Sequence, residues 1–234
     1  YGGNAADGSA LNNQLSITKE ASVNGSAYSG YSSNGEASGN TLKITRTGTI
    51  YESAEGGYVN SGSGAVSGNK VFMESGEVLQ SINSGSTGGS GDATGNSIEL
   101  SGGTVTVSVY GGVSAGGNAK GNSVTIGGGS IDAKAGNVYG GVTLTSESAE
   151  SSGNYLYIKE SGTVDANAYG GYSGFGSALK NIVTMTGGTV GDCLYGGRVS
   201  EKSNGEASYN EVTISGGTVS NDVIGGYSQN GDVI

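Results

Sequence analysis

The most regular feature of the chain is an asparagine followed by two apolar residues at alternate positions. This Asn-x-apolar-x-apolar pattern occurs eight times, at Asn13, Asn40, Asn69, Asn96, Asn122, Asn154, Asn181 and Asn210. Alternation with a period of two over so short a run is typical of a half-buried β-strand. The sequence therefore predicts eight equivalent short strands.

Two further marks divide the chain into units. A glycine turn and a β-branched residue follow each predicted strand, as in Ser-Gly-Gly-Thr-Val at 101–105 and 215–219. The string Tyr-Gly-Gly, or a variant of it, then begins at Tyr1, Tyr28, Glu55, Asn83, Tyr110, Tyr139, Tyr169, Tyr195 and Ile224. These marks lie 26 to 30 residues apart, so the chain holds eight units of about 28 residues.

Each unit therefore contains three short β-like pieces separated by glycine corners, which is typical of one coil of a β-solenoid. Parallel strands joined by crossovers wind with a right hand. We predict an all-β fold, a right-handed parallel β-helix of about eight coils with three short strands per coil, as a single domain spanning 1–234. The chain starts and stops within a repeat, so we expect it to be a segment of a longer protein.

The asparagines call for a structural explanation because they recur at one position of every unit. An amide at an inward position can bond to the amide of the next coil and form a polar ladder. The other interpretation is an asparagine in a left-handed turn. An alanine stands three residues before most of them, at Ala10, Ala37, Ala93, Ala119, Ala178 and Ala207.

Composition excludes several kinds of chemistry. Glycine provides 49 of the 234 residues, a share that would indicate disorder if no period were present. Histidine is absent, which excludes histidine-based catalytic triads and histidine metal ligands. The one cysteine, Cys193, excludes an internal disulfide and cysteine zinc sites. We expect no cofactor and no metal site.

Charge and hydropathy bear on the possible partners. The net charge of −10 disfavours a nucleic acid, whose phosphates need basic clusters. No apolar run reaches the length of a membrane-spanning helix, so we expect no membrane insertion within this segment.

The acidic residues give little indication of catalysis. A polysaccharide-cleaving site would need clustered carboxylates. Asp132, Asp165, Asp192 and Asp222 stand seven, four, three and two residues before the next mark, so they do not align in one row. We expect no catalytic residues and no enzyme activity.

The tyrosines of the marks form a more regular set. Because an apolar or small residue precedes each mark, alternation turns Tyr110, Tyr139, Tyr169 and Tyr195 outward as a surface row. A second row lies three positions on, at Tyr31, Tyr58, Tyr172 and Tyr227. Such rows can bind sugar rings or a protein partner, or they can form a stacking ladder that stiffens the rod. Both interpretations stay open, and the ladder is the simpler one.

Length variation is concentrated in one corner of the unit. The step from the second glycine of the mark to the asparagine holds 9 residues in four units and up to 12 in the others, as at 142–153 and 198–209. Variable polar loops on a rigid scaffold often carry function.

The repeat Gly-x-Ala-x-x-Asn-x-Val-Thr-Ile-Ser-Gly-Gly-Thr-Val, continued by Val-Tyr-Gly-Gly and clearest in 110–139 and 169–219, resembles the passenger regions of bacterial autotransporters and related surface adhesins. The resemblance implies an exported protein at the bacterial cell surface, anchored in the outer membrane through a region outside this chain. It implies a role in adhesion or self-association, with a host or bacterial surface protein, a glycan or the protein itself as partner.

We therefore expect a non-enzymatic extracellular module, a rigid passenger or stalk. Two alternatives from other classes stay open: a polysaccharide-binding or polysaccharide-degrading β-helix protein, and a self-assembling structural filament.

Overall fold

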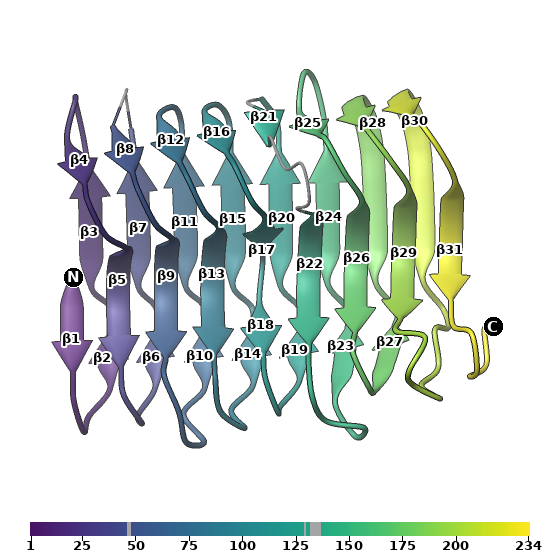
Figure 1. Ribbon diagram of the computed structural model, residues 1–234, viewed down its shortest axis with the longest axis horizontal. Helices are drawn as coiled ribbons and strands as arrows, with labels where there is room; N and C mark the ends of the chain where they lie inside the picture. The colour runs from purple at the N-terminus through teal and green to yellow at the C-terminus, as the bar shows by residue number, and fades with distance from the viewer. Residues whose placement is uncertain (46–47, 129, 132–136) are drawn as a thin grey trace.

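The computed structural model describes residues 1–45, 48–128, 130–131 and 137–234. All the regular structure in these residues is β-strand, and the strands stack in parallel as a β-solenoid of eight coils. Figure 1 shows the coils side by side from the N-terminus to the C-terminus, wound with a right hand. The predicted fold class is confirmed.

Sheet A contains the Tyr-Gly-Gly marks. Its strands are β1 (Gly3–Ala5), β5 (Ala27–Ser32), β9 (Ala54–Val59), β13 (Ile82–Thr87), β17 (Val109–Tyr110), β18 (Val113–Ser114), β22 (Val138–Thr143), β26 (Ala168–Ser173), β29 (Leu194–Val199) and β31 (Val223–Tyr227).

Sheet B is formed by two- and three-residue strands. They are β2 (Ala10–Leu11), β6 (Ala37–Ser38), β10 (Val66–Ser67), β14 (Ala93–Thr94), β19 (Ala119–Lys120), β23 (Glu150–Ser152) and β27 (Ser177–Leu179).

Sheet C has two rows of strands. The row after the asparagines is β3 (Gln14–Ile17), β7 (Thr41–Ile44), β11 (Lys70–Met73), β15 (Ser97–Leu100), β20 (Ser123–Ile126) and β24 (Tyr155–Ile158). The row of the β-branched residues is β4 (Ser22–Val23), β8 (Thr49–Ile50), β12 (Glu77–Val78), β16 (Thr104–Val105), β21 (Ser130–Ile131) and β25 (Thr163–Val164). The nine-residue strands β28 (Ile182–Val190) and β30 (Glu211–Val219) run through both rows and join them into one sheet.

Most coils thus carry four strand positions where three were predicted. The additional one is sheet B, whose strands, such as β6 and β14, begin at the alanine that precedes the asparagine. A two-residue strand contains no alternation to detect, so only its contact with the equivalent residues of the next coil defines it.

The register explains how a chain with only 33% apolar residues has a core. Equivalent residues lie one above the next, so Leu42, Val71, Ile98, Val124 and Leu156 form one buried column. A parallel column follows two residues on, from Ile44 to Ile158, and others come from the β-branched row and the residue before each mark. Each coil needs only a few inward side chains because its flat faces are covered by its neighbours.

The corner between sheets A and B is where the loops differ in length, as the sequence indicates. We call it the loop corner and define it by the segments 33–36, 60–65, 88–92, 115–118, 144–149, 174–176 and 200–206. These segments leave the strands of sheet A at one edge of the rod, along the bottom of Figure 1.

Candidate functional site

The asparagines lie in a single column inside the corner between sheets B and C. From Asn13 to Asn210, each side-chain Nδ2 donates to the Oδ1 of the next asparagine at 2.9–3.0 Å. The same Oδ1 also accepts a hydrogen bond from the backbone N–H of the preceding asparagine, as between Asn96 and Asn122 at 3.0 Å. The second Nδ2 proton reaches a carbonyl of sheet B one coil back, Ala93 in the case of Asn122. These amides are therefore bonded to the protein itself.

The second glycine of each mark makes room for this column. A Cβ placed on Gly141 would lie 2.4 Å from the side chain of Asn154, and the same conflict recurs at Gly112 with Asn122 and at Gly171 with Asn181. Real Cβ contacts are longer than this. The second glycine of the mark and the asparagine thus belong to one packing unit, although they lie 10 to 13 residues apart in the chain.

The tyrosines of sheet A stack along the axis. The ring centroids of Tyr110 and Tyr139 are 5.0 Å apart, those of Tyr139 and Tyr169 4.8 Å, and those of Tyr169 and Tyr195 5.0 Å, with planes within 11° of parallel. Tyr172, in the second row, packs edge-on against both Tyr139 and Tyr169 at 5.9 Å. The inner rings of this stack therefore have aromatic partners on both faces.

Burial agrees with this packing. Tyr169 and Tyr195 are only 3% and 9% exposed, although they stand on the outer side of the sheet. Burial raises the pKa of the Tyr195 phenol to about 12, and burial also raises the pKa of Tyr139. A sugar-binding platform needs an open ring face, whereas both faces of Tyr139 and Tyr169 are stacked against neighbouring rings.

Arg198 extends the tyrosine stack, a role that the sequence did not indicate. Its guanidinium carbon lies 5.3 Å from the ring centroid of Tyr195, 5.5 Å from that of Tyr227 and 6.0 Å from that of Tyr169. One of its nitrogens also donates to the Tyr169 hydroxyl at 3.2 Å. A cation in contact with three aromatic rings is stabilised by their negative faces.

The tyrosine column is interrupted in the third and fourth coils. Glu55 and Asn83 occupy the mark position there, in register with Tyr28 on one side and Tyr110 on the other. Glu55 is 5% exposed and accepts a hydrogen bond of 2.6 Å from the Asn83 side chain. The sequence shows a glutamate at a position that is usually tyrosine, but only the structure shows that this glutamate is buried.

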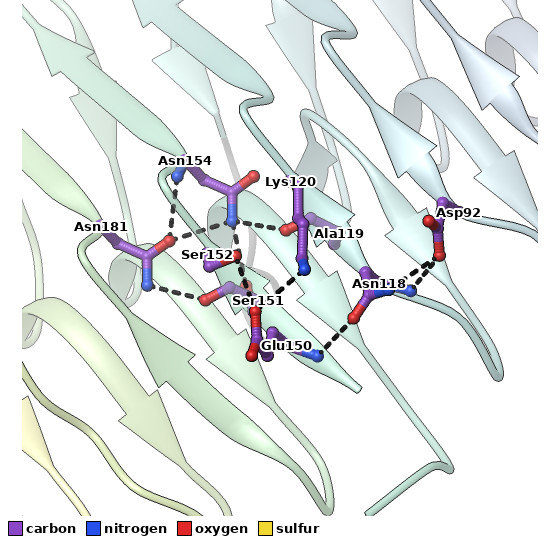
Figure 2. A network of polar contacts seen from close by, with 9 residues as sticks. All are labelled: Asp92, Asn118, Ala119, Lys120, Glu150, Ser151, Ser152, Asn154 and Asn181. Carbon is purple, nitrogen blue, oxygen red and sulfur yellow. Dashed lines mark hydrogen bonds and ion pairs between the residues drawn. The ribbon is translucent and has the colours of Figure 1, made fainter. Parts of the chain in front are cut away.

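A second polar stack lies at the loop corner, parallel to the asparagine column. Figure 2 shows both: Asn154 and Asn181 belong to the column, and Asp92, Asn118 and Glu150 form the outer stack. Asp92 accepts from the backbone and side chain of Asn118 at 2.7 and 3.1 Å, and Asn118 in turn accepts from the Glu150 N–H at 3.0 Å. Lys120 closes the stack with an ion pair to Glu150 at 2.9 Å. These polar residues thus stabilise the turns of successive coils.

The loop corner of the last three coils also forms an open hollow of about 400 Å³. The turn residue Phe175 lines it with a ring that is 40% exposed. The charged side chains of Glu147, Lys202 and Glu206 line it as well. We call this the corner hollow. It brings together an exposed aromatic ring and charges of both signs from three consecutive loops.

The aspartates considered for catalysis do not gather at this hollow. Asp192 is bound by the Asn221 side chain at 2.6 Å, which lowers the pKa of its carboxyl group, and Asp165 and Asp222 are exposed. Asp132 lies outside the described residues. Within the described ranges, no group of three or more acidic or cysteine residues is arranged to hold a metal ion.

No protein-family model, curated protein or solved structure matches this chain significantly. The described part of the chain contains no helix that is long and apolar enough to cross a bilayer. What is established is the β-solenoid of about eight coils.

Proposed function

We propose that this chain is a stiff, non-catalytic module of a bacterial surface adhesin, similar to an autotransporter passenger, and that its loop corner makes the contact with a partner. The observation that carries the proposal is a division between internal and exposed chemistry. The asparagine amides and most tyrosine rings are bonded or packed from coil to coil. The corner hollow instead presents an exposed phenyl ring, and the loops that line it differ in length from coil to coil.

Stiffness follows from the same contacts. Most coils are joined to the next by three parallel sheets and by the asparagine column, so bending the rod would stretch hydrogen bonds on one side. A rigid rod holds its loops away from whatever anchors it. Loops on such a scaffold can vary without changing the core.

The corner hollow suits a glycan or a protein loop. An aromatic ring supplies an apolar contact surface, and carboxylate, ammonium and amide groups around it supply hydrogen bonds. Two acidic residues, Glu147 and Glu206, against one basic residue, Lys202, give the hollow an acidic balance, in keeping with the net charge of −10.

The test compares the chain with a Phe175→Ala/Lys202→Ala variant on a glycan array and in sedimentation velocity. We expect the wild type to be retained by a glycan or to self-associate, and the variant to lose at least about tenfold in affinity. The control is Tyr51→Ala/Lys70→Ala, which makes the same two kinds of truncation at exposed positions away from the hollow. Equal binding by the wild type and the Phe175 variant, or release of reducing ends from a polysaccharide, would contradict the proposal.

A further inference from the structure

A further inference concerns Glu55 and does not depend on the corner hollow. Glu55 stands at the outward mark position of β9, yet it is 5% exposed. One carboxyl oxygen accepts from Asn83, and the other oxygen, Oε2, is buried without any hydrogen-bond partner. A buried polar atom without a partner is uncommon in proteins, so this one requires an explanation.

In the part of the chain that the structure describes, no basic side chain pairs with this carboxyl group. The groups that face it are Tyr28 of β5, Tyr58 of its own strand and the uncharged Asn83 of β13. Of the ion pairs formed by the described residues, none includes Glu55. A buried carboxylate without a counter-charge is strongly disfavoured, whereas a neutral carboxylic acid is tolerated. Burial accordingly raises the pKa of Glu55 to about 8, although the Asn83 hydrogen bond favours the charged form.

The rings around Glu55 are packed closely but asymmetrically. Tyr58 lies 5.6 Å from Tyr28 and 5.6 Å from Tyr31, measured between ring centroids. On its other side, the next residue in the row is Ser86, which has no ring. The Tyr58 hydroxyl makes only one long contact, 3.5 Å to Asn60. Tyr58 is therefore held by ring packing on one side and has a small neighbour on the other.

We propose that Glu55 is a proton-dependent switch in the tyrosine face of the second to fourth coils. With the carboxyl group protonated, Tyr28 and Tyr58 stay packed over it. When its proton passes to solvent, the charge left on the carboxylate must be hydrated, and Tyr58 moves toward the Ser86 side to admit water. Acidification reverses the change and closes the face.

The pH range of this change contains few competing titrations. The chain has no histidine, the residue that most often titrates near neutral pH. Tyr28 and Tyr58 have pKa values raised above the ordinary phenol value, chiefly by burial, so they stay protonated while Glu55 ionises. The switch is therefore separable from ionisation of the rings themselves.

The experiment is NMR of the whole chain with labelled glutamate carboxyl groups and labelled tyrosine rings, titrated from about pH 4 to about pH 9.5. We expect the Glu55 carboxyl signal to titrate near 8 and the ring signals of Tyr58 and Tyr28 to shift with the same midpoint. In Glu55→Gln the ring shifts should disappear. Glu77→Gln, an exposed glutamate of the same coil, should leave them unchanged.

Either of two results would overturn the switch: a Glu55 midpoint near that of an exposed glutamate, or a midpoint near 8 with ring signals that do not move. Should Glu55→Gln fold poorly, Glu55→Tyr provides the second test because it extends the tyrosine column. Ring shifts near pH 8 that persist in Glu55→Tyr would equally contradict the proposal.

Discussion

At the scale of single residues, the glycines of the marks matter through the space they leave. In each coil the second glycine faces the asparagine amide of the same coil at a distance that admits no side chain. The glycine content is thus partly a consequence of the asparagine column.

Gly141→Ala should therefore destabilise the protein by about 1–3 kcal/mol, because the new methyl group would overlap the Asn154 side chain. Urea denaturation measures the change. Gly8→Ala is the matched control, since a Cβ there meets no atom within 4 Å and should change stability by less than about 0.5 kcal/mol. Equal effects of both changes would show that the contact with the Asn154 amide does not explain the glycine at position 141.

Asn122→Ala should lower the free energy of unfolding by at least about 2 kcal/mol, because it removes the side-chain amide that both donates and accepts hydrogen bonds at that position of the asparagine column. Asn96 would lose its acceptor, and the Ala93 carbonyl and Asn154 would lose a donor. Asn60→Ala removes an exposed asparagine with one long contact and should be nearly neutral in the same denaturation experiment. A small effect at Asn122 would mean that the column contributes little to stability.

Glu55 should also make stability depend on pH. Its pKa is raised in the folded state, so its contribution is fully present below about pH 4.5 and is lost as the pH rises toward 8. The loss should be on the order of a few kcal/mol, because one pKa unit corresponds to about 1.4 kcal/mol. Thermal unfolding should show a decline in stability from about pH 5 to about pH 8 that is absent in Glu55→Gln. The same decline in both proteins would assign the effect to other groups.

At the scale of elements, sheet A owes part of its cohesion to ring stacking across strands. β17, β22, β26 and β29 each contribute one ring to a continuous stack, and Arg198 of β29 packs on its end. These contacts tie strands together beyond their backbone hydrogen bonds.

A double-mutant cycle on Tyr139 and Tyr169 tests this cohesion. The alanine variants should show a favourable coupling of about 0.5–1.5 kcal/mol in unfolding free energy. Tyr139 paired with the distant, exposed Tyr51 serves as the control and should show none. A Tyr139–Tyr169 coupling of zero would indicate that the rings contribute only by covering the sheet.

At the scale of the whole molecule, the solenoid is a sum of coil interfaces. Each strand pairs with its equivalents in adjacent coils, so no interaction depends on a particular total number of coils. This architecture has a consequence for deletions.

Removal of residues 169–194, one whole coil, should leave a folded and shorter rod. It would bring Tyr139 onto Tyr195 and Asn154 onto Asn210, which are pairs of equivalent residues. The circular dichroism spectrum of the shortened protein should have the same β-sheet signal per residue. Its free energy of unfolding should be lower by the contribution of one interface between coils. Removal of 169–181 alone, about half a coil, would shift every column and should unfold the region. Unfolding of the whole chain by the full-coil deletion would contradict the additive view.

The sequence by itself determined the period, the parallel stacking and the positions of the asparagine and apolar columns. Such features repeat in every unit, and alternation along one strand is a local property that the residues display directly. The sequence did not predict sheet B, because a two-residue strand such as Ala37–Ser38 is too short to show alternation of apolar and polar residues. The tertiary structure alone decided that the faces of Tyr139 and Tyr169 are covered, that Glu55 is buried without a counter-charge and that Phe175 and Lys202 line one hollow. The reason is that burial and ring orientation depend on side chains one coil away, about 28 residues along the chain, and no local pattern specifies them.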